Sequence, residues 1–149
     1  MQNDAVQRMK ALEFLVGEWH LDYTYRQGGE TRRDLVGSGT LRPILDDRYL
    51  AFDYQVRNRE SGKSGGSAHG VLAWDPKGER YRYFWFESSG AFLPATGELR
   101  AAGTLFLDWE GVDCTQTFTR VDDDHVVLEM GCPEQDLHLR VDMSRRAES

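Results

Sequence analysis

One segment of the chain carries a carboxylate and three aromatic rings at alternate positions. If residues 79–88 form a strand, successive side chains point to opposite faces. One face then holds Tyr81, Tyr83, Trp85 and Glu87, and the other holds Arg80, Arg82, Phe84 and Phe86. The face without arginines is the better interior candidate, so we expect Glu87 at or near an interior wall. A carboxylate there can act as an acid or a base, but a structural role is commoner.

Tyrosine and tryptophan residues recur at alternate positions well beyond this segment. Such side chains either fill the interior of a small β-structure or line a cavity within it. Tyrosines favour the cavity, because each buried hydroxyl needs a partner and can orient a ligand. We predict a ligand site containing Trp19, Tyr23, Tyr54, Trp74, Tyr83, Trp85, Glu87 and Arg120.

Arg120 has two interpretations. It shares a predicted face with Phe118, and from the rim it can neutralise a ligand carboxylate. The alternative is an exposed arginine at the end of a strand.

The histidines do not form a metal site in the sequence. The four residues, His20, His69, His125 and His138, are spread over four predicted strands, and no two have ligand spacing. His20 and His138 alternate with apolar residues and are expected to point outward. The chain has no GxSxG elbow, phosphate-cradling glycine loop or HExxH motif. We therefore assign no catalytic residue, no metal and no cofactor.

The elements that must position these residues are mostly strands. Apolar residues at three- and four-residue intervals predict one amphipathic helix over residues 4–14, with Asp4 and Gln7 as a capping box. From Trp19 onward the apolar period is two, which is typical of strands. A first strand begins near Gly17, and further strands are predicted near residues 33–44, 48–58, 66–75, 79–88, 91–100, 103–110, 113–121, 125–131 and 136–143.

Ten consecutive strands leave no room for crossover helices. Strands joined by short connections pair as antiparallel neighbours, and closure into a barrel removes exposed edges. We therefore predict an all-β fold, a closed or nearly closed up-and-down antiparallel β-barrel of about ten strands. A length of 149 residues suits one core. We expect a single domain over residues 1–149, with the helix at 1–14 and the barrel at 17–144.

The two cysteines are predicted to be cross-strand neighbours. A three-residue hairpin loop at 122–124 would place Phe118 opposite Leu128 and Cys114 opposite Cys132. A disulfide is geometrically feasible at such a pair, but two buried thiols are favoured in a reducing compartment.

Composition excludes several classes of partner. The chain has 18 Lys and Arg against 25 Asp and Glu, a net charge of −7, which would repel a nucleic-acid backbone. No apolar stretch is long enough to cross a bilayer, and the first residues lack the pattern of a secretion signal. We expect a cytoplasmic protein with neither a nucleic-acid nor a membrane partner.

Several short motifs occur in a characteristic order. They are LVGEW at 15–19, ILDDRYL at 44–50, WDPKG at 74–78 and WFES at 85–88. Together they resemble the lipocalin-like bacterial barrels of domain of unknown function 1579 (DUF1579), over nearly the whole chain. The resemblance implies a calycin-type barrel with a short helix at its mouth or base, and no established activity. These sequences usually carry an aspartate where this chain has Glu87.

A weaker resemblance concerns the C-terminal strand. His138 and Leu139, followed by Val141, Met143 and Arg145, resemble the last strand of the haem-binding nitrobindin barrels. Residues 17–26 do not reproduce the glycine-rich first strand of those proteins. A haem barrel is therefore an alternative only.

The leading hypothesis is a module that binds a small hydrophobic or amphipathic molecule inside the barrel. One alternative is an enzyme of unassigned reaction in which Glu87 or His69 transfers a proton within the same cavity. Another is a barrel with a filled interior that acts as a scaffold and forms a homodimer.

Overall fold

The computed structural model describes residues 2–146. Its strands are β1 (Gly17–Gln27), β2 (Glu30–Arg32), β3 (Leu35–Ile44), β4 (Tyr49–Asn58), β5 (Ser64–Asp75), β6 (Arg80–Glu87), β7 (Phe92–Ala101), β8 (Thr104–Trp109), β9 (Thr115–Asp122), β10 (His125–Cys132) and β11 (Leu137–Arg145). The helical segments in this part of the chain are the α-helix α1 (Gln2–Lys10) and the 3-10 turns η1 (Glu13–Leu15) and η2 (Pro133–Gln135).

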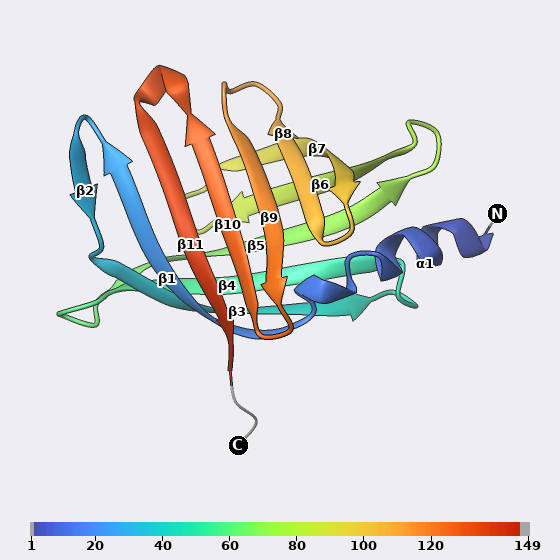
Figure 1. The fold of residues 1–149 in the computed structure, drawn as a ribbon, viewed down its shortest axis with the longest axis horizontal. Helices are drawn as coiled ribbons and strands as arrows, with labels where there is room; N and C mark the ends of the chain where they lie inside the picture. The colour runs from blue at the N-terminus through green and yellow to red at the C-terminus, as the bar shows by residue number, and fades with distance from the viewer. Residues whose placement is uncertain (1, 147–149) are drawn as a thin grey trace.

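The strands form one antiparallel sheet that closes on itself (Figure 1). From β3 to β11 each strand pairs with the next in sequence, and β1 pairs with β3. β1 also pairs with β11, from Trp19 opposite Arg145 to Gln27 opposite Leu137, and this pairing joins the two edges. β2 is a three-residue addition beside the end of β1. The predicted all-β, up-and-down barrel of about ten strands is thus confirmed.

Alternating burial explains why these segments form strands. In β1, Trp19, Leu21 and Tyr23 are buried, whereas His20 between them is exposed, as predicted. In β6, Tyr81 and Tyr83 are buried and Phe84 faces outward. Because the side chains of a pleated strand point to alternate faces, each apolar set contributes to one interior.

One end of the barrel, which we call the base, is closed by the segment that precedes β1 (Figure 1). Leu12 and Leu15 are fully buried there, and the Trp19 indole Nε1 donates a hydrogen bond to the Leu15 carbonyl at 2.9 Å. The predicted short N-terminal helix is present, but it is shorter than the predicted range 4–14, since α1 ends at Lys10 and η1 follows as a separate turn.

The β9–β10 hairpin has the predicted register. Phe118 lies opposite Leu128, and Gln116 lies opposite Met130. Cys114 and Cys132 are neighbours with a Cα–Cα distance of 4.3 Å, and they form a disulfide. The expectation of two free thiols was therefore wrong, because the register brings the two sulfur atoms within bonding distance. Disulfides are typical of oxidising compartments, so this bond adds no support to the predicted cytoplasmic location.

The helical segments are short in comparison with a bilayer. Among residues 2–146, no helix has the length and apolar character that a membrane-spanning helix requires.

Candidate functional site

A cavity of about 320 Å³ occupies the barrel interior on the side away from the base. Its lining reaches the connections at the open end, which we call the mouth, through Val112 and Gln135. Deeper in the barrel it includes Leu21 and Met143. The volume is near the lower end of the range of small-molecule sites, roughly 300–1,000 Å³.

One wall of the cavity is aromatic. It comprises Phe52 and Tyr54 from β4, Tyr83 and Trp85 from β6, and Trp109 from β8. The rings of Tyr54 and Trp85 are stacked at 5.2 Å, and those of Tyr83 and Trp109 are 5.6 Å apart. These ring–ring contacts hold the aromatic wall together.

The wall built from β10 and β11 is aliphatic and sulfur-containing. Its side chains are Leu128, Met130, Cys132, Leu137, Leu139, Val141 and Met143. Methionine side chains adapt to irregular shapes. A flat molecule between the two walls would contact rings on one side and flexible apolar groups on the other.

Gln116 supplies a buried polar group to the cavity. Its side chain is 6% exposed, and its Oε1 accepts a hydrogen bond from the Trp109 indole Nε1 at 3.1 Å. This bond uses one lone pair of Oε1, and the Nε2 amino group keeps its N–H donors for another partner.

Glu87 is exposed at the mouth and is oriented by two hydrogen bonds. The Trp85 indole Nε1 donates to Oε2 at 3.0 Å, and the Ser89 hydroxyl donates to Oε1 at 3.2 Å. Glu87 is the charged residue among those that line the cavity. Glu87 was expected at or near an interior wall, and it lines the cavity at the rim, where its carboxylate is hydrogen-bonded.

Three tyrosine hydroxyls stay protonated within this site. Burial is the main cause that raises the pKa of Tyr23, of Tyr83 and of Tyr54, the last to about 12. The charge of Glu87 raises the pKa of Tyr54 further, and Tyr54 in turn raises the pKa of both other phenols. The Tyr23 and Tyr54 hydroxyls are also within hydrogen-bonding reach of each other. Protonated phenols can donate a hydrogen bond to a ligand or accept one from it.

Five of the residues predicted for the ligand site line this cavity: Tyr23, Tyr54, Tyr83, Trp85 and Glu87. They come from β1, β4 and β6, which are widely separated in sequence. The barrel brings them together because alternation turns each of them inward on adjacent or nearby strands.

Trp19, Trp74 and Arg120 lie elsewhere. Trp19 is fully buried in the base. Trp74 packs edge-on against Tyr81 at 4.9 Å and lies under the guanidinium of Arg8 from α1.

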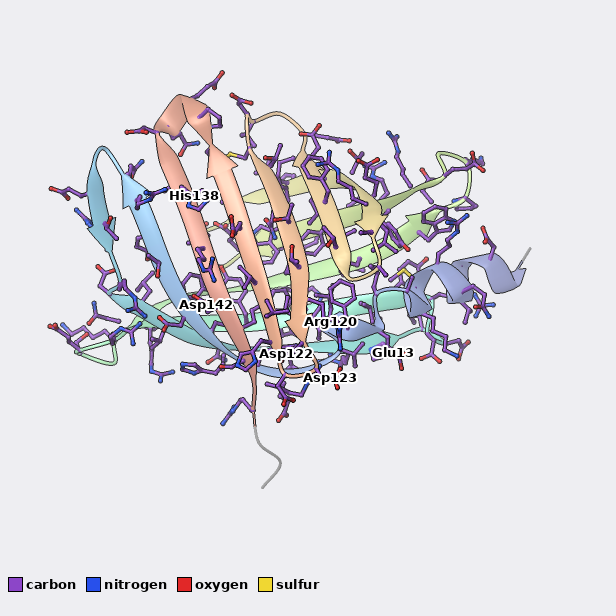
Figure 2. All side chains as sticks on the ribbon, viewed as in Figure 1. Glu13, Arg120, Asp122, Asp123, His138 and Asp142 are labelled. Atoms are coloured by element: carbon purple, nitrogen blue, oxygen red, sulfur yellow. A yellow bond between two sulfur atoms is a disulfide. The ribbon has the colours of Figure 1, made fainter. Side chains whose placement is uncertain are left out.

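Arg120 has the second of its two predicted roles. It is exposed at the base end of β9 and contacts the Asp123 carboxylate in the adjacent turn (Figure 2). Its side chain is therefore paired outside the barrel, far along the strand from the mouth.

Sequence reasoning missed Trp109, Gln116 and Met130 as lining residues. A signal for two of them was present, because the predicted hairpin register already set Gln116 opposite Met130 on the face of Phe118. Trp109 ends β8, where alternation with Leu105 and Leu107 also predicts an inward side chain.

His69 does not line the cavity. On β5 it alternates with the inward-facing Ala68 and Leu72, and its Nδ1 lies 2.6 Å from Asp53 Oδ1 on the outer face. The alternative in which His69 transfers a proton within the cavity was wrong for this reason. His138 also faces outward on β11, 3.6 Å from the Glu129 carboxylate (Figure 2).

Two solved structures show a similar fold. The structure of Rv2717c from M. tuberculosis has a TM-score of 0.65 and 16% identity, covering 93% of this chain and 97% of that one. The S-type phycobiliprotein lyase CPES from Guillardia theta has a TM-score of 0.54 and 9% identity, covering 99% and 98%. No curated protein sequence matches this chain significantly.

A family model agrees with the resemblance noted in the sequence. It is described as "Protein of unknown function (DUF1579)" and matches residues 5–138, which include β1 to β10 and the closed base. The chain therefore belongs to the DUF1579 family.

Proposed function

We propose that this protein binds a small, largely apolar molecule inside its barrel, with Tyr23, Tyr54, Tyr83, Trp85 and Glu87 among the contacts. The observation that carries the proposal is the unfilled volume of about 320 Å³ between an aromatic and an aliphatic wall. Small-molecule sites have this composition: mostly apolar lining with a few polar groups that fix orientation. A scaffold barrel with a filled interior would leave no such space.

Binding of N-phenyl-1-naphthylamine tests the proposal. This uncharged probe becomes fluorescent in apolar surroundings, so titration of the protein should give a saturable increase in emission at one equivalent. Native mass spectrometry of the protein purified from its own host would separately reveal a molecule that co-purifies with it.

Two matched variants locate the binding. Met130 lines the cavity, whereas Val127 on the same strand points outward. Met130→Trp should abolish the increase in emission because the added ring fills the cavity, and Val127→Trp should preserve it. Equal binding by both variants, or no saturable binding by the unmodified protein, would refute the proposal.

A further inference from the structure

The charge of the cavity restricts what can occupy it. Among the described residues that line it, one side chain is charged, Glu87 at the mouth, and none is an arginine, lysine or histidine. A carboxylate or phosphate inside would lose its hydration without gaining a cationic partner, which is costly, and it would also face the Glu87 carboxylate.

Two arginines near the ends of the barrel pair with carboxylates outside the cavity and do not offer a positive charge to an anion inside it. Arg120 contacts Asp123 at the base. Arg32 lines a neighbouring pocket with Tyr25 on the β2 side, and there it is 3.3 Å from the Glu30 carboxylate. Neither residue belongs to the lining.

The side-chain amide of Gln116 provides a hydrogen-bond donor in the buried part of the cavity. Gln116 is 94% buried, its Oε1 is held by Trp109, and no partner for Nε2 occurs among residues 2–146. Gln116 lines the cavity, so its Nε2 has open space beside it and is not among the polar side-chain atoms sealed without a partner in the described core. A ligand acceptor that meets these N–H groups gains a hydrogen bond.

Two indoles connect this donor to the carboxylate at the mouth. Trp109 bonds Gln116, Trp85 bonds Glu87, and the two indole rings are 6.5 Å apart. The two rings meet edge to face, at an interplanar angle of 74°. A molecule that packs beside this indole pair would therefore have one end near Gln116 and the other near Glu87.

We propose that the occupant of this cavity is a flat, uncharged or cationic molecule with a hydrogen-bond acceptor at its buried end, next to Gln116, and a donor or positive charge near Glu87. This inference rests on the proposed function and adds the polarity of the ligand to it. Binding of fatty acids or other organic anions in the cavity of this protein would contradict the inference.

Displacement of N-phenyl-1-naphthylamine by four ring compounds of similar size tests the inference. They are 2-ethylnaphthalene, which lacks polar groups; 2-acetylnaphthalene, which carries an acceptor; 2-naphthylmethylammonium; and 2-naphthoate. We expect 2-acetylnaphthalene to displace the probe about fivefold more strongly than 2-ethylnaphthalene, the effect of one net hydrogen bond. We expect 2-naphthoate to be at least about tenfold weaker than 2-acetylnaphthalene.

Two variants assign the effects to residues. In Gln116→Met the ratio between 2-acetylnaphthalene and 2-ethylnaphthalene should fall to about one, while Gln55→Met on the outer face should leave it unchanged. In Glu87→Gln the affinity for 2-naphthylmethylammonium should fall relative to 2-ethylnaphthalene, while Glu98→Gln on β7 should have no effect. Ratios within one variant are compared, so a general loss of affinity does not obscure the result.

The outcomes separate the two proposals. Absence of N-phenyl-1-naphthylamine binding refutes the proposed function, and the inference with it. Binding of this probe with 2-naphthoate as effective as 2-acetylnaphthalene leaves the function intact and overturns the charge rule. If Gln116→Met keeps the preference for 2-acetylnaphthalene over 2-ethylnaphthalene, the role of Gln116 is overturned. It is also overturned if the wild-type protein shows no such preference.

Discussion

The ring of Tyr83 packs directly against Gly70 of the neighbouring strand. A Cβ atom at Gly70 would lie 2.5 Å from Cε1 of Tyr83 and 2.6 Å from its hydroxyl oxygen. Tyr83 is fully buried at this position and forms part of the aromatic wall. The absent side chain of Gly70 thus gives the Tyr83 ring its place beside Trp85 and Trp109.

Substitution of Gly70 should therefore disturb both stability and binding. We expect Gly70→Ala to lower the free energy of unfolding by about 2 kcal/mol, because the methyl group overlaps the Tyr83 ring. Gly131 is a matched control, since a Cβ there meets no atom within 4 Å. Gly131→Ala should change stability by no more than about 0.5 kcal/mol. Guanidinium denaturation of both variants checks this, and equal losses would contradict the packing argument.

The tyrosine cluster should make the protein sensitive to alkali. A phenol has a pKa of about 10 in the unfolded chain, and the folded protein raises the pKa of Tyr54 to about 12. Between pH 10 and pH 12 the unfolded state releases a proton that the folded state keeps. The contribution of Tyr54 to the free energy of unfolding is therefore fully present below pH 10 and is lost as pH rises. Each such tyrosine contributes a slope of up to about 1.4 kcal/mol per pH unit.

Denaturation at pH 9, 10 and 11 measures this slope, and absorbance at 295 nm reports ionised tyrosine. Tyr54→Phe should make the decline shallower. Ionisation of every tyrosine near pH 10 in the still-folded protein would disprove the prediction.

The disulfide between Cys114 and Cys132 should stabilise the hairpin that carries Gln116 and Met130. The cysteines are 18 residues apart in sequence. Closing a loop of this length lowers the conformational entropy of the unfolded chain, which stabilises the folded state by about 3 kcal/mol. The double variant Cys114→Ala, Cys132→Ala should have a free energy of unfolding lower by that amount, and its stability should not change when reductant is added. Intact mass measured without reductant provides the direct check: two free thiols in protein from its own host would contradict the bond.

Arg145 should contribute more to stability than a typical surface arginine. Its Nη1 donates to the Val16 carbonyl at 2.6 Å, its Nε donates to the Asp123 carbonyl at 3.1 Å, and the guanidinium lies 4.3 Å from the Trp19 ring centroid. We expect Arg145→Leu to cost about 2 kcal/mol.

Arg140 on the same strand is the comparison. It forms exposed ion pairs with Asp142 and Glu129, which usually contribute little. Arg140→Leu should change the melting temperature only slightly. A larger loss for Arg140→Leu than for Arg145→Leu would invert the expectation.

The candidate site could be predicted in part because inward direction is a local property. Tyr23, Tyr54, Tyr83 and Trp85 were predicted from alternation, and each lines the cavity. The same rule placed Trp19 inward correctly, but the base of the barrel encloses it. Alternation reports which face a side chain occupies and says nothing of its height along the barrel axis.

By itself, the sequence determined the β-barrel, the inward and outward faces of its strands, and the register of the β9–β10 hairpin. These features follow from the pleat of single strands and the length of single turns, which neighbouring residues control. Only the tertiary structure decided where the interior is filled and where it is open. That depends on how Leu12 and Leu15 close the base and on how rings from β4, β6 and β8 meet. The volume left over is a difference between what the whole sheet encloses and what its side chains occupy, and no local pattern encodes it.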